Sequence, residues 1–351
     1  MDRAEESVLP ATPGPARDRA VAAWLLACCA LVLAMVVIGG ITRLTHSGLS
    51  IVEWQPIAGA LPPLGEDEWQ EIFRKYRQTP EYRKVNQGMN LAEFKGIFWW
   101  EYVHRLLGRL IGAAFLLPFL WFALRGRLAH GLAPKLLGIF LLGGLQGAMG
   151  WYMVASGLVD DPRVSHFRLT AHLGIAFLIY AAMLWIALDL IYPRAPRENT
   201  GRRGLLRFAL ALNALILAMA LSGGLVAGIR AGLAFNTFPL MNGRWVPQEI
   251  FQIEPWYMNF FSNIATVQFD HRLIAWLLAL LTPWFWVRVR REAAAPRARL
   301  AADLLLGALA LQIGLGISTL LLAVPVPLAA AHQAGALLVF SAALFSAHSL
   351  R

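Results

Sequence analysis

The sequence alternates between long apolar runs and polar connections. Eight runs reach roughly 20 residues or more, the length that crosses the hydrocarbon core of a bilayer as a helix. The pattern therefore predicts eight transmembrane helices, within about residues 21–41, 98–124, 136–159, 166–192, 205–229, 264–287, 300–324 and 327–348.

The connections differ in length and charge. Residues 42–97 form a long loop with more acidic residues than any other connection, and we expect it to be partly helical and folded over the membrane face. Residues 230–263 form a second long loop, rich in Asn, Trp and Pro. The connections after the second, fourth and sixth runs instead carry Arg125, Arg127 and Lys135, then Arg194, Arg197, Arg202, Arg203 and Arg207, then Arg288, Arg290, Arg291, Arg297 and Arg299. The positive-inside rule places these connections, and with them both termini, in the cytoplasm.

Composition supports the same class. The chain is 58% hydrophobic and 15% charged, with a mean hydropathy of +0.55, values typical of a polytopic membrane protein. Its net charge of +10 comes largely from loop arginines that orient helices, which argues against nucleic acid as a partner. Both cysteines, Cys28 and Cys29, are adjacent inside the first run, so neither suits a loop disulfide or a zinc site.

An internal repeat divides the chain into halves. Gly39-Gly40 precedes the first long loop, and Gly223-Gly224 precedes the second in the same relative place. We therefore predict an all-α fold of two pseudo-symmetric four-helix bundles, residues 19–195 and 196–351, with residues 1–18 as a disordered cytoplasmic tail.

Four histidines lie inside apolar runs, near the outer ends of the second, fourth, sixth and eighth. Each predicted half holds one pair, listed in order as His104, His172, His271 and His332. Two histidines on facing helices at matching depth can supply both axial ligands of a haem iron. A structural zinc would want four ligands. A lone intramembrane histidine otherwise serves in helix–helix hydrogen bonding, but four at equivalent depths are costly without a shared function.

The residues beside these histidines are similar in the two halves, and two of the positions that differ carry a carboxylate in one half only. Arg105 and Arg272 follow their histidines and suit porphyrin propionates, unless they only snorkel to the membrane surface. Glu101 stands one turn before His104, where the second half has Gln268. A carboxylate one turn before the histidine in one half only indicates that this site does chemistry while the other carries a cofactor. Asp270, next to His271 and facing elsewhere, is by the same logic structural. The alternative is that Glu101 charges the first turn of its helix.

The chain resembles the haem A synthase family. The resemblance is carried by Glu101 to Arg105, by His271-Arg272 and His332-Gln333, and by the motifs Gly39-Gly40-Ile41-Thr42-Arg43-Leu44-Thr45, Ser47-Gly48-Leu49-Ser50, Trp54-Gln55-Pro56, Asn86 and Phe94-Lys95. It implies an eight-span oxidoreductase acting on a CH or CH2 group, which oxidises the C8 methyl of haem O to the formyl group of haem A by successive hydroxylations. It also implies that Glu101 is catalytic, that His104 and His172 bind the substrate haem O, and that His271 and His332 hold haem b.

The resemblance carries further expectations. The chain lacks the outer-loop cysteine pair of some members and so is similar to the branch found in proteobacteria and mitochondria. We expect a bacterial inner membrane, haem sites toward the periplasm, haem O synthase and an unidentified electron donor or acceptor as partners, and a possible homo-oligomer. From the residues alone, two other functions stay open: a di-haem cytochrome b that only transfers electrons, and a transporter with a histidine proton relay.

Overall fold

The computed structural model describes residues 16–54, 58–159, 162–192, 202–292 and 295–351. These residues form helices and loops with one isolated bridge and no strand, which confirms the predicted all-α class. The tail predicted over residues 1–18 falls largely outside this part of the chain. Within it, eight helices are long and apolar enough to cross a membrane, as predicted: α1 (Ala16–Leu44), α4 (Leu91–Leu124), α5 (Leu132–Ala155), α6 (His166–Ile191), α7 (Arg202–Gly228), α9 (Ile264–Arg291), α10 (Pro296–Leu321) and α11 (Val326–Ser349).

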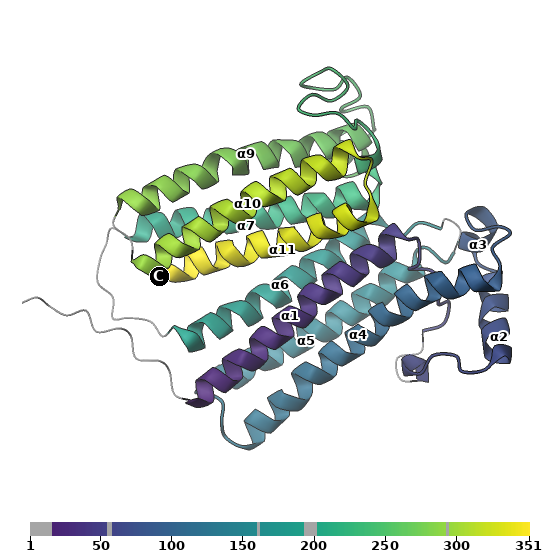
Figure 1. The fold of residues 1–351 in the computed structure, drawn as a ribbon, viewed down its shortest axis with the longest axis horizontal. Coiled ribbons are helices and arrows are strands. Elements are labelled where there is room, and N and C mark those ends of the chain that lie inside the picture. The colour runs from purple at the N-terminus through teal and green to yellow at the C-terminus, as the bar shows by residue number, and fades with distance from the viewer. Residues whose placement is uncertain (1–15, 55–57, 160–161, 193–201, 293–294) are drawn as a thin grey trace, which may run out of the picture.

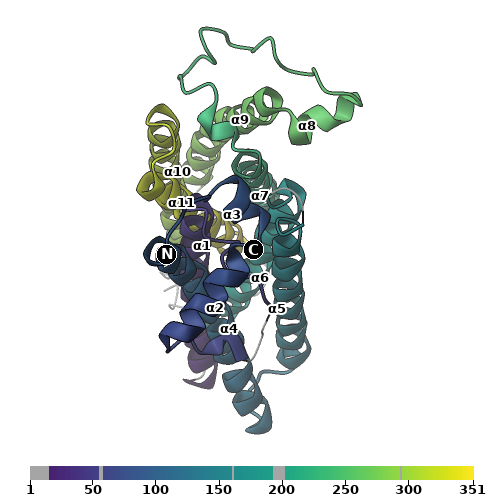
Figure 2. The same ribbon diagram turned by 90° about the vertical axis from the view of Figure 1, so that its right-hand side faces the viewer.

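The eight helices form two sets of four (Figure 2). In the first set α1 contacts α4 and α6, while α5 contacts α4 and α6. In the second set α7 contacts α9 and α11, while α10 contacts α9 and α11, so the order of contacts is the same. The sets meet where α6 packs on α7 and α11, and where α1 packs on α11. A two-fold axis between them, and the boundary at residue 195, stay predictions.

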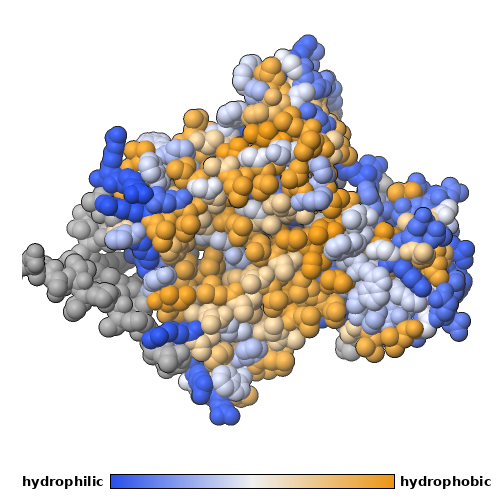
Figure 3. Space-filling view, viewed as in Figure 1, coloured by the Kyte–Doolittle hydropathy of each residue, from blue (hydrophilic) through white to orange (hydrophobic). Residues whose placement is uncertain are grey.

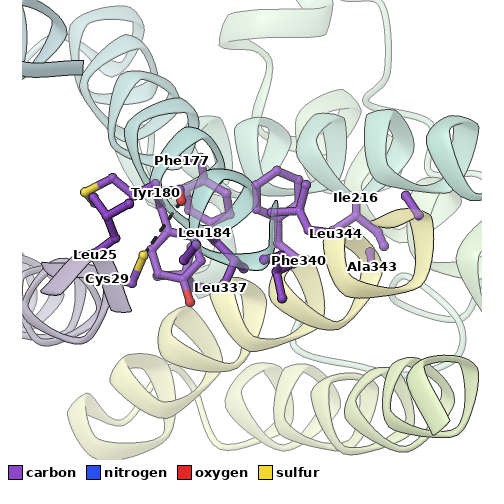
Figure 4. Close-up of a cluster of buried hydrophobic side chains, with 14 of the residues drawn as sticks. Leu25, Cys29, Phe177, Tyr180, Leu184, Ile216, Leu337, Phe340, Ala343 and Leu344 are labelled. Atoms are coloured by element: carbon purple, nitrogen blue, oxygen red, sulfur yellow. Dashed lines mark hydrogen bonds between the residues drawn. The ribbon is translucent and has the colours of Figure 1, made fainter. Parts of the chain in front are cut away.

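Apolar side chains fill the contact between the two sets (Figure 4). Phe177 of α6 packs against Phe340 of α11, with ring centroids 5.4 Å apart. Tyr180 and Ser341 join the same helices through a hydrogen bond of 2.8 Å. Close packing and buried hydrogen bonds of this kind hold helices together where the surrounding lipid is as apolar as the side chains.

Polar surface lies at both ends of the helices. On the face seen in Figure 3, an apolar surface covers their middle, with hydrophilic residues beyond it on either side. The start of α1 and the C-terminus lie at one end, opposite α2 and α3 of the first long loop (Figure 1). Which end faces the cytoplasm remains a prediction of the arginine pattern.

The first long loop is folded, as expected. It contains a short 3-10 helix (Ala58–Ala60), α2 (Glu66–Tyr76) and α3 (Pro80–Lys84). Aromatic residues of α2 pack against α4 in a cluster of six buried rings: Trp69, Phe73, Tyr76, Phe94, Phe98 and Tyr102. This packing explains why α4 begins at Leu91, seven residues before the predicted apolar run.

The start of α4 shows whether Glu101 lies in the first turn of its helix. Asn90 is the N-cap, and its side chain and that of Glu93 form a reciprocal capping box. Glu101 lies ten residues after Leu91, almost three turns into the helix. The interpretation that Glu101 charges the first helical turn is therefore wrong.

The second long loop is mostly irregular. It contains 3-10 helices at Ala231–Leu233 and Trp256–Met258, followed by the short α8 (Asn259–Ser262). Asn263 caps α9, accepting a hydrogen bond from the backbone of Thr266 at 3.0 Å. This cap places His271 seven residues, about two turns, after the start of α9.

Candidate functional site

The structure places His104 of α4 and His172 of α6 close enough for charges on the two rings to interact. Each imidazole faces a glycine on a neighbouring helix. A Cβ added to Gly39 would lie 3.0 Å from His104 Nε2, and one added to Gly150 would lie 3.1 Å from His172 Cε1. A larger residue at either glycine would displace an imidazole, so these glycines make room for the rings.

The second set repeats this arrangement. His271 of α9 and His332 of α11 lie within electrostatic range of one another. A Cβ on Gly223 would lie 3.3 Å from His271 Cε1, and one on Gly316 would lie 2.8 Å from His332 Cε1. The four predicted histidines are thus grouped in the two predicted pairs.

The ring nitrogens fit iron ligands. His172 Nδ1 and His332 Nδ1 are buried and have no hydrogen-bond partner among the described residues. An unpartnered nitrogen buried in an apolar helix set is costly unless it binds something. In the described part of the chain no three His, Cys, Asp or Glu side chains gather as metal ligands, whereas a haem iron needs only two axial ligands. A pair of imidazoles in each set therefore fits the two axial positions of a haem iron.

Glu101 is buried, with 2% of its surface exposed, and is held by donors on both sides. Its Oε2 accepts hydrogen bonds from Ser50 Oγ at 2.8 Å and from the Ile51 backbone at 2.7 Å. Its Oε1 accepts from Arg105 Nε at 3.0 Å and from Arg105 Nη2 at 2.6 Å. Four donors fix the carboxylate one helical turn from His104.

Arg105 also holds the first long loop. Its Nη2 donates to the Ile51 carbonyl at 2.8 Å and its Nη1 to the Glu53 carbonyl at 3.2 Å. A small hollow of about 40 Å³ opens beside it, lined by Trp54 and Trp151. The guanidinium therefore joins the loop to Glu101.

In the second set, Gln268 and Arg272 hydrogen-bond to the second long loop. Gln268 Nε2 donates to the carbonyls of Ala231 and Ala234 at 2.7 and 2.6 Å, and its Oε1 accepts from Arg272 Nη2 at 3.0 Å. Arg272 also donates to the Phe235 carbonyl at 2.7 Å, yet its Nε is buried without a partner in the described chain. The unpartnered N–H suits an acidic group such as a propionate.

Two site residues escaped the sequence reasoning. Gln146 of α5 lies 3.5 Å from His172 Nε2, and Gln312 of α10 donates to the His332 carbonyl at 2.8 Å. The signal was present, because Leu-Gln precedes the histidine-facing glycine at the same spacing in both halves, as Leu145-Gln146 to Gly150 and Leu311-Gln312 to Gly316.

The other histidines and the cysteines lie apart from the two pairs. His348 is buried near Asp189, His166 lies 3.3 Å from Ser262, and His46 lies 3.2 Å from Arg230. Cys28 and Cys29 are free and buried, as the first apolar run predicts.

Fold and site together define a polytopic helical membrane protein with two buried histidine pairs, each suited to an iron porphyrin. The chain belongs to the cytochrome oxidase assembly protein family (COX15-CtaA), whose model matches residues 22–344. This membership confirms the family resemblance drawn from the sequence motifs.

Individual relatives agree over nearly the whole chain. A protein named "Heme A synthase" from Nitrosospira multiformis is 64% identical over 335 residues, which cover 95% of this chain and 94% of the relative. One of the same name from Nitrosomonas eutropha is 59% identical, covering 94% and 93%. "Heme A synthase COX15" from Arabidopsis thaliana is 45% identical, covering 97% and 76%. These names favour haem A synthesis over the electron-transfer cytochrome that paired histidines alone would allow.

Proposed function

We propose that this protein is a haem A synthase, which oxidises the C8 methyl group of haem O to the formyl group of haem A by successive hydroxylations, for cytochrome oxidase assembly. The observation that carries the proposal is the buried carboxylate of Glu101 one helical turn before His104, at the position where the other half has Gln268. The high identity to relatives named for this activity supports it.

The first set would hold the substrate. His104 and His172 would bind haem O between α4 and α6, with the glycines that face them leaving room for the rings. His271 and His332 would hold haem b, which would supply one-electron transfer when bound. Arg105 and Arg272 would contact propionates at the outer ends of the sites.

Glu101 and Gln268 occupy matching positions, but only Glu101 has a carboxylate. Removing hydrogen from a methyl group releases protons and electrons, and a carboxylate can accept a proton or stabilise developing positive charge. An amide at position 268 can do neither. Because Ser50, the Ile51 backbone and Arg105 already hold Glu101, its orientation is set before substrate arrives.

The proposed function also suggests where the protein is located and which partners it has. We propose that the protein is a multi-pass protein of the bacterial inner membrane with both sites toward the periplasm. Haem O synthase would deliver the substrate, and a separate donor or acceptor would exchange electrons with the haem b site. A homo-oligomer is compatible with these roles.

The test is Glu101→Gln, expressed in cells that supply haem O, followed by extraction and chromatography of the porphyrins. We expect haem O to persist and haem A to fall to background, while the protein still purifies with haem b. Gln268→Ala serves as the matched change in the other half and should affect haem b retention instead. Haem A at the normal level in Glu101→Gln would contradict the catalytic role, and haem b with no haem A in the unaltered protein would favour a cytochrome.

A further inference from the structure

One imidazole of the four has a side-chain hydroxyl beside it. Ser222 Oγ, on α7, lies 2.7 Å from His271 Nδ1. The same Oγ donates its hydrogen to the Met219 carbonyl at 2.9 Å, and a carbonyl can only accept. With its single hydrogen committed to Met219, the hydroxyl accepts a hydrogen bond from His271 Nδ1–H.

This bond selects one tautomer of His271. A neutral imidazole carries one hydrogen, so a hydrogen on Nδ1 leaves the lone pair on Nε2. Second-shell partners of this kind fix the orientation of a histidine ligand and increase its basicity. Ser222 therefore prepares Nε2 of His271 for a permanent bond to iron.

In the described part of the substrate half, no hydroxyl makes this contact with His104. Matching Gly39-Gly40 with Gly223-Gly224 places Ile38 where the second half has Ser222. Among the described residues, neither ring nitrogen of His104 makes a hydrogen bond. The partner glycines match in the two halves, but the hydroxyl occurs in one only.

We propose that Ser222 is a positioning residue that makes the C-terminal site a retained, low-potential haem site, and that its absence beside His104 lets the N-terminal site exchange its haem. A substrate site must release its product after each turnover, whereas a resident cofactor must stay. A hydrogen bond from Nδ1–H strengthens electron donation to iron and favours the ferric state. This inference rests on the proposed binding of haem b by His271.

The experiment compares Ser222→Ala and Ser222→Thr with Ser346→Ala in the full-length protein, purified in detergent with its haem. Ser346 is a suitable control because it is a buried helix serine whose hydroxyl donates to the Ala342 carbonyl, on a different helix from His271. The signal of the C-terminal haem is identified by its loss in His271→Ala. Its midpoint potential, its low-spin ferric electron paramagnetic resonance and its transfer rate to excess apomyoglobin are then measured.

We expect Ser222→Ala to raise the midpoint potential of this haem, shift its ferric resonance and speed its transfer about 10-fold, the lower end of second-shell effects. Ser222→Thr keeps a hydroxyl and should restore all three values, and Ser346→Ala should change none. The other haem signal should keep its potential in every variant.

Two results would overturn the proposal in distinguishable ways. If His271→Ala removes one haem but Ser222→Ala leaves its potential and transfer rate unchanged, or Ser222→Thr behaves like Ser222→Ala, the role of the hydroxyl is wrong and the haem assignment stands. If the unaltered protein purifies without haem, or His271→Ala keeps both signals, the proposed function and the role of Ser222 fail together.

Discussion

Arg105 and Glu101 form a buried ion pair across one helical turn, with Nη2 2.6 Å from Oε1, and the same nitrogen also donates to the Ile51 carbonyl. Arg272 and Gln268 make the matching contact in the other half without a carboxylate. Each pair thus holds one of the two long loops next to a histidine site. Only the first adds a group that can take part in proton chemistry.

Arg105→Lys should show whether Arg105 acts by positioning Glu101 and the first long loop or only by its positive charge. Lysine keeps the positive charge but lacks the planar fork that reaches Glu101 and two loop carbonyls at once. We expect haem A formation in cells to fall on the order of 10- to 100-fold, because Glu101 and the loop lose their alignment. Arg74→Lys, in an exposed pair with Glu71, is the control and should leave activity unchanged. Normal haem A from Arg105→Lys would mean that the fork is dispensable.

Gly316→Ala should displace one haem ligand. The new methyl would lie 2.8 Å from His332 Cε1, too close for the imidazole to keep its place. We expect the haem content of the C-terminal site to fall although alanine favours helix. Gly314→Ala, two residues earlier on α10, meets nothing within 4 Å and should keep full haem. Haem-to-protein ratios measured by the pyridine haemochrome method compare the two, and equal ratios would contradict the role of Gly316.

The eight membrane-spanning helices could be predicted from the sequence because their length and hydropathy distinguish them from the loops. The boundary furthest from its prediction is the start of α4. Glu93 and Lys95 interrupt the apolar pattern there, and Phe94 packs on Phe73 of α2, a contact that hydropathy does not encode. The Asn90 and Glu93 capping box was the local signal that could have found it. Repeated motifs likewise predicted which histidines form pairs.

The site was less accessible to sequence reasoning. Ser50 and Ile51 reach Glu101 across about 50 residues of chain, and no spacing rule connects them. A glycine in an apolar run does not show what faces it. A Cβ at Gly143, Gly147 or Gly314 would meet nothing within 4 Å, whereas one at Gly150 or Gly316 would meet a histidine ring.

Gly143→Leu should affect the substrate site alone. Gly143 lies seven residues before Gly150, on the same face of α5, where α10 has the buried Leu309 at the matching position. A Cβ on Gly143 meets nothing within 4 Å, so leucine there would add bulk on the face that carries Gly150, and we expect less haem O bound and less haem A formed, with haem b retained. Gly138→Leu adds the same side chain on another face of α5 and should be neutral. Loss of haem b instead would show that Gly143 does not border the substrate site.

Glu81 should make stability depend on pH. It lies in α3, 2% exposed, and its Oε2 has no hydrogen-bond partner among the described residues. Burial raises the pKa of this carboxyl to about 7, against an opposing effect of Arg230 from the second long loop. Because the folded pKa lies above the unfolded value of 4.5, the folded state binds the proton more tightly. Stability is therefore full below about pH 4.5 and falls as pH rises through 7.

Thermal unfolding in detergent at pH 5 and pH 8 tests this dependence. Glu81→Gln mimics the protonated carboxyl, so we expect it to match the unaltered protein at pH 5 and to be more stable at pH 8, by up to about 3 kcal/mol. Glu71→Gln is the control, because hydrogen bonding to Arg74 lowers the pKa of Glu71 and leaves that carboxyl ionised at both pH values. A Glu81→Gln protein that gains nothing at pH 8 would show that Arg230 already compensates the buried charge.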